Sequence, residues 1–170
     1  MAWRFAWYKV YYPLEFYAAY FSTKNQFVFV DILKSGYKAI SNKLDEFIKR
    51  QSSKSEIPLS QKEVEFIPLM EIAQELYARG LKIKNVDLKL SDANKWTVDK
   101  KEKALIPPFA VVEGLGSSAA ESIVKARKEH EFVSIEDLKD RTKLNTKTIN
   151  TLKELGVLDD LDETNQMTLF

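Results

Sequence analysis

Apolar residues recur every three or four positions along much of this chain, which is the period of an amphipathic helix. The spacing predicts three helical regions, over residues 1–22, 27–50 and 60–79. Pro13 divides the first region, because proline ends one helix and is tolerated in the first turn of the next. Gly36 weakens the second region, and Ser60 with Glu63 is spaced as a capping box that begins the third. Gly80 is expected to end that third helix.

The pattern changes over residues 81–108. Alternating apolar and polar positions predict short strands at residues 86–90, 96–98 and 104–106. The cluster Ser91–Asn94 has the composition of a turn. We expect a small β meander that connects the helical first part to the remainder of the chain.

A glycine turn follows and leads directly into a fourth helical pattern. Gly114 and Gly116 flank the single apolar residue Leu115, and glycine allows another backbone to come very close. Ser118 and Glu121 are spaced as a capping box, which predicts that a helix begins just after the turn. Unpaired N–H groups and partial positive charge make a helix N-terminus a favourable site for phosphate. This is the helix-hairpin-helix pattern, although an ordinary helical corner with a glycine turn also fits.

A second, degenerate unit is predicted between Ser134 and Gly156. Its turn is Leu144-Asn145-Thr146, where Asn145 is expected to cap the following helix. The candidate contacts with DNA backbone in both units are Gly114, Leu115, Gly116, Ser117, Ser118, Ala119, Lys125, Arg127, Lys128, Lys143, Asn145, Thr146 and Lys147. A single exposed Lys or Arg is usually only solvated, so the hypothesis depends on their clustering near two helix N-termini.

Composition limits the other possibilities. The net charge is +1, so DNA binding must come from local patches and backbone dipoles. The chain has no cysteine, which excludes disulfides and thiolate metal sites. No apolar run is long enough to span a membrane. The sequence contains no Asp-x-Asp pair between apolar strands, no phosphate-binding P-loop and no His/Cys cluster, so we expect no catalytic residue, metal site or cofactor in this chain.

Two further segments resemble one family. The run Tyr8-Lys9-Val10-Tyr11-Tyr12-Pro13-Leu14-Glu15-Phe16-Tyr17-Ala18-Ala19 resembles a signature in the fingers domain of bacterial DNA polymerase III α subunits. Met1-Ala2-Trp3-Arg4 is similar to the preceding residues in the PolC branch, where Met1 would correspond to an internal methionine.

The terminal Gln166-Met167-Thr168-Leu169-Phe170 resembles the pentapeptide that binds the bacterial sliding clamp, at the position where PolC-type chains carry it. In such a motif Leu169 and Phe170 fill an apolar pocket, Met167 lines it, and Gln166 forms a hydrogen bond at its rim. Burying Leu and Phe contributes about 1.5–3 kcal/mol each before the cost of ordering, which predicts weak binding that works as a tether.

The resemblance implies a mainly α chain with a small β insert. Its expected parts are a helical end of the fingers (1–80), a β-containing connector (81–108), a duplex-binding tandem helix-hairpin-helix region (109–160) and a flexible clamp-binding tail (161–170). The implied partners are duplex DNA, read without sequence preference, the sliding clamp and the rest of a polymerase chain, with no membrane.

The resemblance further implies a cytoplasmic, nucleoid-associated DNA-directed DNA polymerase, whose catalytic aspartates and Mg²⁺ lie in a palm domain outside this chain. Two alternatives remain open from the sequence. One is a free-standing helix-hairpin-helix module of a repair protein, and the other is a protein-interaction scaffold whose glycine turn does not contact DNA.

Overall fold

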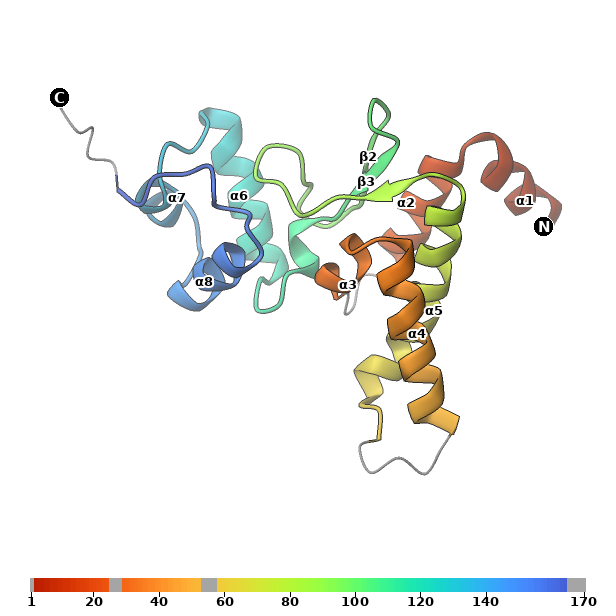
Figure 1. Ribbon diagram of the computed structural model, residues 1–170. Coiled ribbons are helices and arrows are strands. Elements are labelled where there is room, and N and C mark those ends of the chain that lie inside the picture. The colour runs from red at the N-terminus through yellow and green to blue at the C-terminus, as the bar shows by residue number, and fades with distance from the viewer. Residues whose placement is uncertain (1, 25–28, 53–57, 165–170) are drawn as a thin grey trace.

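The computed structural model describes residues 2–24, 29–52 and 58–164. It is mainly helical with one small sheet, which confirms the predicted fold class (Figure 1). The elements are α1 (Ala2–Tyr11), α2 (Pro13–Thr23), α3 (Val30–Lys34), α4 (Tyr37–Ser52), α5 (Gln61–Ala78), β1 (Lys82–Ile83), β2 (Thr97–Asp99), β3 (Ala104–Ile106), the 3-10 helix η1 (Phe109–Val111), α6 (Ser117–Glu129), α7 (Ile135–Arg141) and α8 (Thr146–Glu154).

Pro13 divides the first helical region as predicted. It is the first residue of α2, where its missing N–H costs no hydrogen bond. The apolar stripe of α2 is buried, and Tyr17 and Phe21 are completely covered. The aromatic side chains of α1 are instead largely exposed, with Trp3 at 78% of its full accessibility. The apolar surface of α1 therefore has little cover within the described residues.

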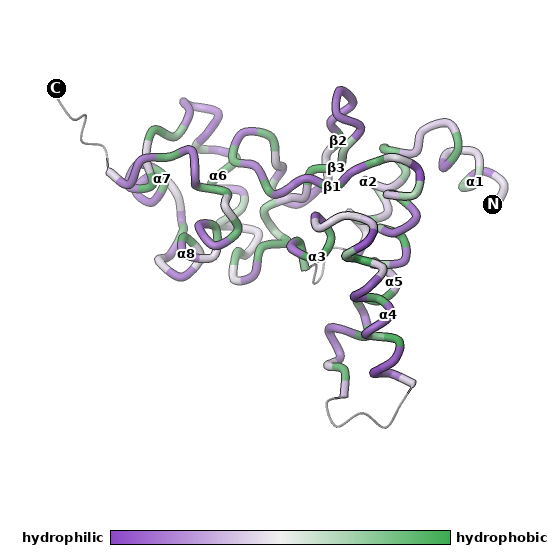
Figure 2. The backbone as a smooth tube through the Cα atoms, viewed as in Figure 1, coloured by the Kyte–Doolittle hydropathy of each residue, from purple (hydrophilic) through white to green (hydrophobic). Residues whose placement is uncertain are grey.

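The helical region predicted over residues 27–50 is not one unbroken helix. Gly36 has φ +90, which an L side chain rarely adopts, and the chain turns there between α3 and α4. α4 and α5 then pack antiparallel and form an arm that projects from the body (Figure 1). Hydrophobic and hydrophilic residues alternate along both helices of the arm (Figure 2). The capping box of Ser60 and Glu63 is present, and Gly80 follows the end of α5 with φ +76.

The sheet has the strand order β1-β3-β2. β2 and β3 pair antiparallel, while β1 pairs parallel to β3, so the predicted meander is wrong in its topology. Two of the predicted strands are confirmed, but the segment 86–90 is not a strand. There the Asp87 carboxylate accepts hydrogen bonds from the backbone N–H groups of Lys89 and Leu90, which curls the chain into a turn.

One continuous hydrophobic core connects the helical first part, the sheet and the last three helices. Trp96 stacks on Phe21 with ring centroids 4.8 Å apart, which joins the connector to α2. Tyr77 donates a hydrogen bond to the carbonyl oxygen of Leu33, which joins α5 to α3. Within the described residues, no helix has the length and apolarity needed to cross a membrane.

Candidate nucleic-acid interface

The first hairpin runs from η1 to α6 and is built around Leu115. Leu115 is buried between two exposed glycines, and its N–H donates to the carbonyl oxygen of Val112 at 3.0 Å. Gly114 has φ +80, a left-handed conformation that favours glycine. Gly116 takes the N-cap position of α6 with an extended backbone. The buried leucine thus anchors the turn while both glycines remain at the surface.

The predicted capping box of Ser118 and Glu121 is wrong. α6 begins at Ser117, and within the described residues its N-terminus has no hydrogen bond from a capping side chain. Glu121 Oε1 instead lies 3.4 Å from Asn94 Nδ2 in the connector. Because a helix leaves its first N–H groups without intrahelical partners and Ser117 and Ser118 are exposed, this end of α6 remains open to a ligand.

The second unit consists of α7, the turn Thr142–Asn145 and α8. Leu144 is buried as Leu115 is in the first unit. Asn145 caps α8 as predicted, because its Oδ1 accepts from the N–H of Thr148 at 2.8 Å. The second turn therefore has a buried leucine, as the first turn has. It differs in containing no glycine and in having a side-chain cap at the helix that follows, where the N-terminus of α6 has none.

The two hairpins contact each other directly. Thr148 Oγ1 lies 3.3 Å from the carbonyl oxygen of Gly114 and 3.0 Å from Asn145 Oδ1, so its one proton is shared between these two acceptors. The N–H of Lys143 donates to Ser122 Oγ at 3.0 Å, and its Nζ lies 3.4 Å from Ser118 Oγ. The N-termini of α6 and α8 are therefore fixed side by side. The sequence analysis did not predict that Thr148 and Ser122 join the two units. The one available signal was that Thr148 stands three residues after the predicted cap, Asn145.

The predicted basic residues fall into two groups. Lys125 and Lys128 on α6, and Lys143 and Lys147 around the start of α8, have exposed side chains. Arg127 is partly buried instead. Its Nη1 donates to the carbonyl oxygen of Leu88 at 2.9 Å, and its guanidinium carbon lies 6.0 Å from the centre of the Phe109 ring.

Burial lowers the pKa of Arg127 from its ordinary value, since desolvation disfavours the charged form. Through its hydrogen bond to the Leu88 carbonyl, the guanidinium group of Arg127 joins α6 to the connector. A contact between Arg127 and DNA remains an untested prediction.

The helix-hairpin-helix motif family model matches residues 80–168, more than half of the sequence. The chain belongs to the helix-hairpin-helix family. The matched range contains the sheet, both hairpins and the start of the terminal tail.

Relatives named PolC-type DNA polymerase III align with nearly the whole chain. The protein of Mycoplasmopsis pulmonis is 44% identical over 169 residues, which cover 99% of this chain and 12% of the relative. The protein of Thermotoga maritima is 45% identical over 171 residues, which cover 100% of this chain and 12% of the relative. The chain thus spans about an eighth of the length of these relatives, in their C-terminal part. The predicted resemblance to PolC-type α subunits is confirmed.

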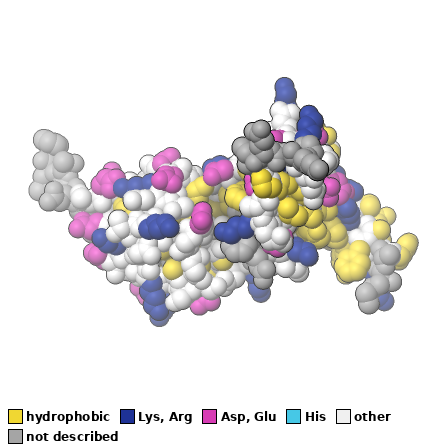
Figure 3. Space-filling model, turned by 90° about the horizontal axis from the view of Figure 1, so that it is seen from below, with side chains coloured by type: hydrophobic (Ala, Val, Ile, Leu, Met, Phe, Trp, Pro, Cys, Tyr) yellow, Lys and Arg dark blue, Asp and Glu magenta, His cyan; other side chains and the backbone are white. Residues whose placement is uncertain are grey.

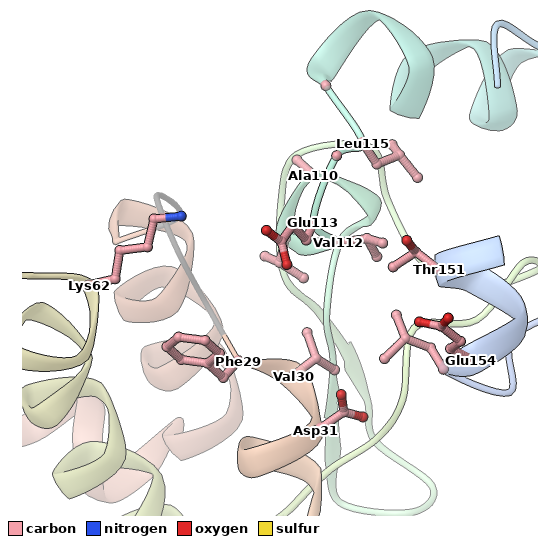
Figure 4. Close-up of a pocket in the computed structure, with 14 residues that line it drawn as sticks. Phe29, Val30, Asp31, Lys62, Ala110, Val112, Glu113, Leu115, Thr151 and Glu154 are labelled. Atoms are coloured by element: carbon pink, nitrogen blue, oxygen red, sulfur yellow. The ribbon is translucent and has the colours of Figure 1, made fainter. Parts of the chain in front are cut away.

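A groove of about 640 Å³ borders the first helix-hairpin-helix unit, between α3, the hairpin and α8 (Figure 4). The carboxylates of Asp31, Glu113 and Glu154 and the ammonium group of Lys62 lie around it, and its apolar lining includes Val30 and Val112. Although Lys34 pairs with Asp31 and Lys62 adds a positive charge, the carboxylates of Glu113 and Glu154 make the groove less favourable for phosphate than an open helix N-terminus. Seen from below, Lys and Arg side chains are interspersed with Asp and Glu ones and form no continuous basic field on that face (Figure 3). The helix N-termini are therefore the more favourable sites for an anion.

The predicted clamp-binding residues Gln166, Met167, Leu169 and Phe170 lie outside the described residues. The chain just before them is attached to the second helix-hairpin-helix unit. The carbonyl oxygen of Asp162 accepts from the N–H of Ile135 at 2.8 Å, and Glu163 pairs with Lys153 at 2.7 Å.

Proposed function

We propose that this chain binds the backbone of duplex DNA without sequence preference, through its paired helix-hairpin-helix units. The observation that carries the proposal is the contact between Thr148 and Gly114, which holds two helix N-termini on one surface. Each terminus presents N–H groups and partial positive charge to a phosphate oxygen. Lys143 and Lys147 add positive charge around one terminus, and Lys125 adds it further along α6. Phosphate contacts of this kind fix a duplex in position and do not read its sequence.

We place this binding in a replicative DNA polymerase, where the chain would hold the newly made duplex behind the active site. The similarity to PolC-type DNA polymerase III extends over α1–α5 as well as over the hairpins, which favours a polymerase over a free-standing repair module. The nucleotidyl transfer itself, and its Mg²⁺, are assigned to a palm domain elsewhere in the parent protein.

The test is fluorescence anisotropy of a labelled duplex titrated with the 170-residue chain. We expect the logarithm of the binding constant to fall linearly with the logarithm of salt concentration and to be the same for shuffled sequences. Gly116→Asp should weaken binding more than Lys128→Ala, because it adds bulk and negative charge where the backbone is approached. No salt dependence, or a strong preference for one sequence, would contradict the proposal.

We further propose that Gln166, Met167, Leu169 and Phe170 tether the polymerase to the sliding clamp. The sequence supports this through two apolar side chains at the end of an acidic, polar stretch. The test is anisotropy of the labelled chain titrated with a Gram-positive sliding clamp, beside a variant that lacks residues 166–170. Saturable binding that disappears with these residues is expected, and equal binding by both chains would refute the tether.

A further inference from the structure

Two side chains from outside the hairpin units hold the end of α8. Asn85 Nδ2 donates to the carbonyl oxygen of Leu155 at 2.6 Å, and Lys34 Nζ lies 3.4 Å from the same oxygen. Lys34 is the last residue of α3, and Asn85 lies in the loop after β1. Lys34 Nζ also lies 3.4 Å from Asn85 Oδ1 and 3.1 Å from Asp31, which lines the groove of Figure 4. We call Lys34, Asn85 and the Leu155 carbonyl the α8 clasp.

The chemistry of the α8 clasp suits a helix C-terminus. The last carbonyl groups of a helix have no intrahelical partner and carry partial negative charge, so an ammonium group and an amide donor both stabilise them. The clasp therefore attaches this end of α8 to α3 and to the connector, two segments that precede both hairpins in the sequence.

The opposite end of α8 carries the proposed contacts with phosphate. α8 has nine residues, which corresponds to a length of about 13 Å. Such a short helix moves as one rod, so a displacement at Leu155 is transmitted to Asn145 and Lys147. The hydrogen bond of Thr148 holds the rod near one end and the clasp holds it at the other.

We propose that Lys34 and Asn85 are positioning residues for duplex binding. They touch no phosphate, but they keep the N-terminus of α8 in line with that of α6, so that both termini engage the same duplex. This inference rests on the proposed function, and it assigns a role in DNA binding to a residue of the helical first part.

The test is a double-mutant cycle on the 170-residue chain, measured by anisotropy with a labelled duplex. Lys34→Met combined with Asn85→Leu should weaken binding about threefold to tenfold, and Lys34→Arg alone should retain it. Lys38→Met, at an exposed lysine on α4, is the matched control and should have no effect. In a Lys147→Ala background the loss should shrink, whereas in a Lys125→Ala background it should persist. Equal losses in both backgrounds would overturn the inference.

Amide hydrogen exchange of the chain without DNA tests independently whether the α8 clasp holds α8 in place. In the Lys34→Met, Asn85→Leu variant the amides of α8 should exchange severalfold faster, while those of α6 should not change. Unchanged exchange in α8 would overturn the inference even if the chain binds DNA. Failure of the unmodified chain to bind any duplex would refute the proposed function, and the exchange data would still decide whether the clasp positions α8.

Discussion

The hydroxyl group of Thr148 lies 3.3 Å from the carbonyl oxygen of Gly114, and this contact joins the second hairpin to the glycine turn of the first. The same hydroxyl group lies 3.0 Å from Asn145 Oδ1, the cap of α8. We expect Thr148→Val to lower the free energy of unfolding by about 1 kcal/mol. It should also weaken duplex binding severalfold, because the two helix N-termini lose their fixed separation. Urea denaturation and anisotropy measure the two effects.

The control for that substitution is Thr151→Val, which removes a hydroxyl about one turn later on α8. That hydroxyl donates to the carbonyl oxygen of Lys147 in the same helix. It should leave duplex binding unchanged. A Thr148→Val chain with normal affinity would show that the hairpins engage DNA independently.

Glu113 immediately precedes Gly114, and its side chain is exposed at the edge of the proposed interface. We expect Glu113→Gln to tighten duplex binding about twofold to fivefold at low salt, because it removes a negative charge near the approaching phosphate. The gain should disappear at high salt. Glu71→Gln, at an exposed position on α5, should change nothing, and an equal gain from it would indicate a general effect of net charge.

Arg127 and Lys128 are neighbours with different predicted roles. Arg127→Met should lower the free energy of unfolding by about 1–2 kcal/mol, since it leaves the Leu88 carbonyl without its donor. It should change duplex affinity little. Lys128→Met should leave stability within about 0.5 kcal/mol and reduce the salt dependence of binding. The reverse pattern, in which Arg127→Met abolishes binding in a fully folded chain, would make Arg127 a direct DNA contact.

Glu63 gives the arm a pH-dependent contribution to stability. The backbone N–H of Ser60 donates to its carboxylate at 2.8 Å, and this bond lowers the pKa of Glu63 below its ordinary value of 4.5. A carboxyl group with a lowered pKa stabilises the folded state above its unfolded pKa, and the stabilisation is lost as pH falls through the folded pKa. Glu63→Gln should therefore lower the free energy of unfolding by about 0.5–1 kcal/mol at pH 7 and by less in acid below the folded pKa.

Denaturation curves across this pH range check that expectation. Asp45→Asn, at an exposed position on α4, is the control for the loss of one negative charge from the arm. A Glu63→Gln difference that stays constant in acid would mean that the charge of the carboxylate contributes nothing.

Local signals predicted much of this fold correctly. Pro13, the pair Ser60 and Glu63, and Asn145 each act through their own backbone or a neighbour within three residues, so the sequence alone is enough to place them. The capping box at Ser118 failed because α6 begins at Ser117 with Gly116 at its N-cap, which places Ser118 inside the helix. The predicted meander failed for a different reason, because the parallel pairing of β1 with β3 depends on a contact between segments about twenty residues apart.

In the candidate site, too, local features were predictable from the sequence and long-range contacts were not. The glycine turn and the asparagine cap were visible as patterns. The partners that join the units, Thr148 and Ser122, make long-range hydrogen bonds that leave no period in the sequence. The α8 clasp could not be predicted from the sequence either, because Lys34 and Leu155 are 121 residues apart.

The pairing of β1 with β3 determines where this chain can be divided. β3 is completely apolar and buried, and it lies between β1 and β2. A fragment that began after Ile83 would retain both hairpins but would leave one edge of β3 without its partner. An uncovered apolar strand edge is a template for self-association. An autonomous hairpin unit must therefore begin before Lys82, so that β1 is retained and covers that edge of β3.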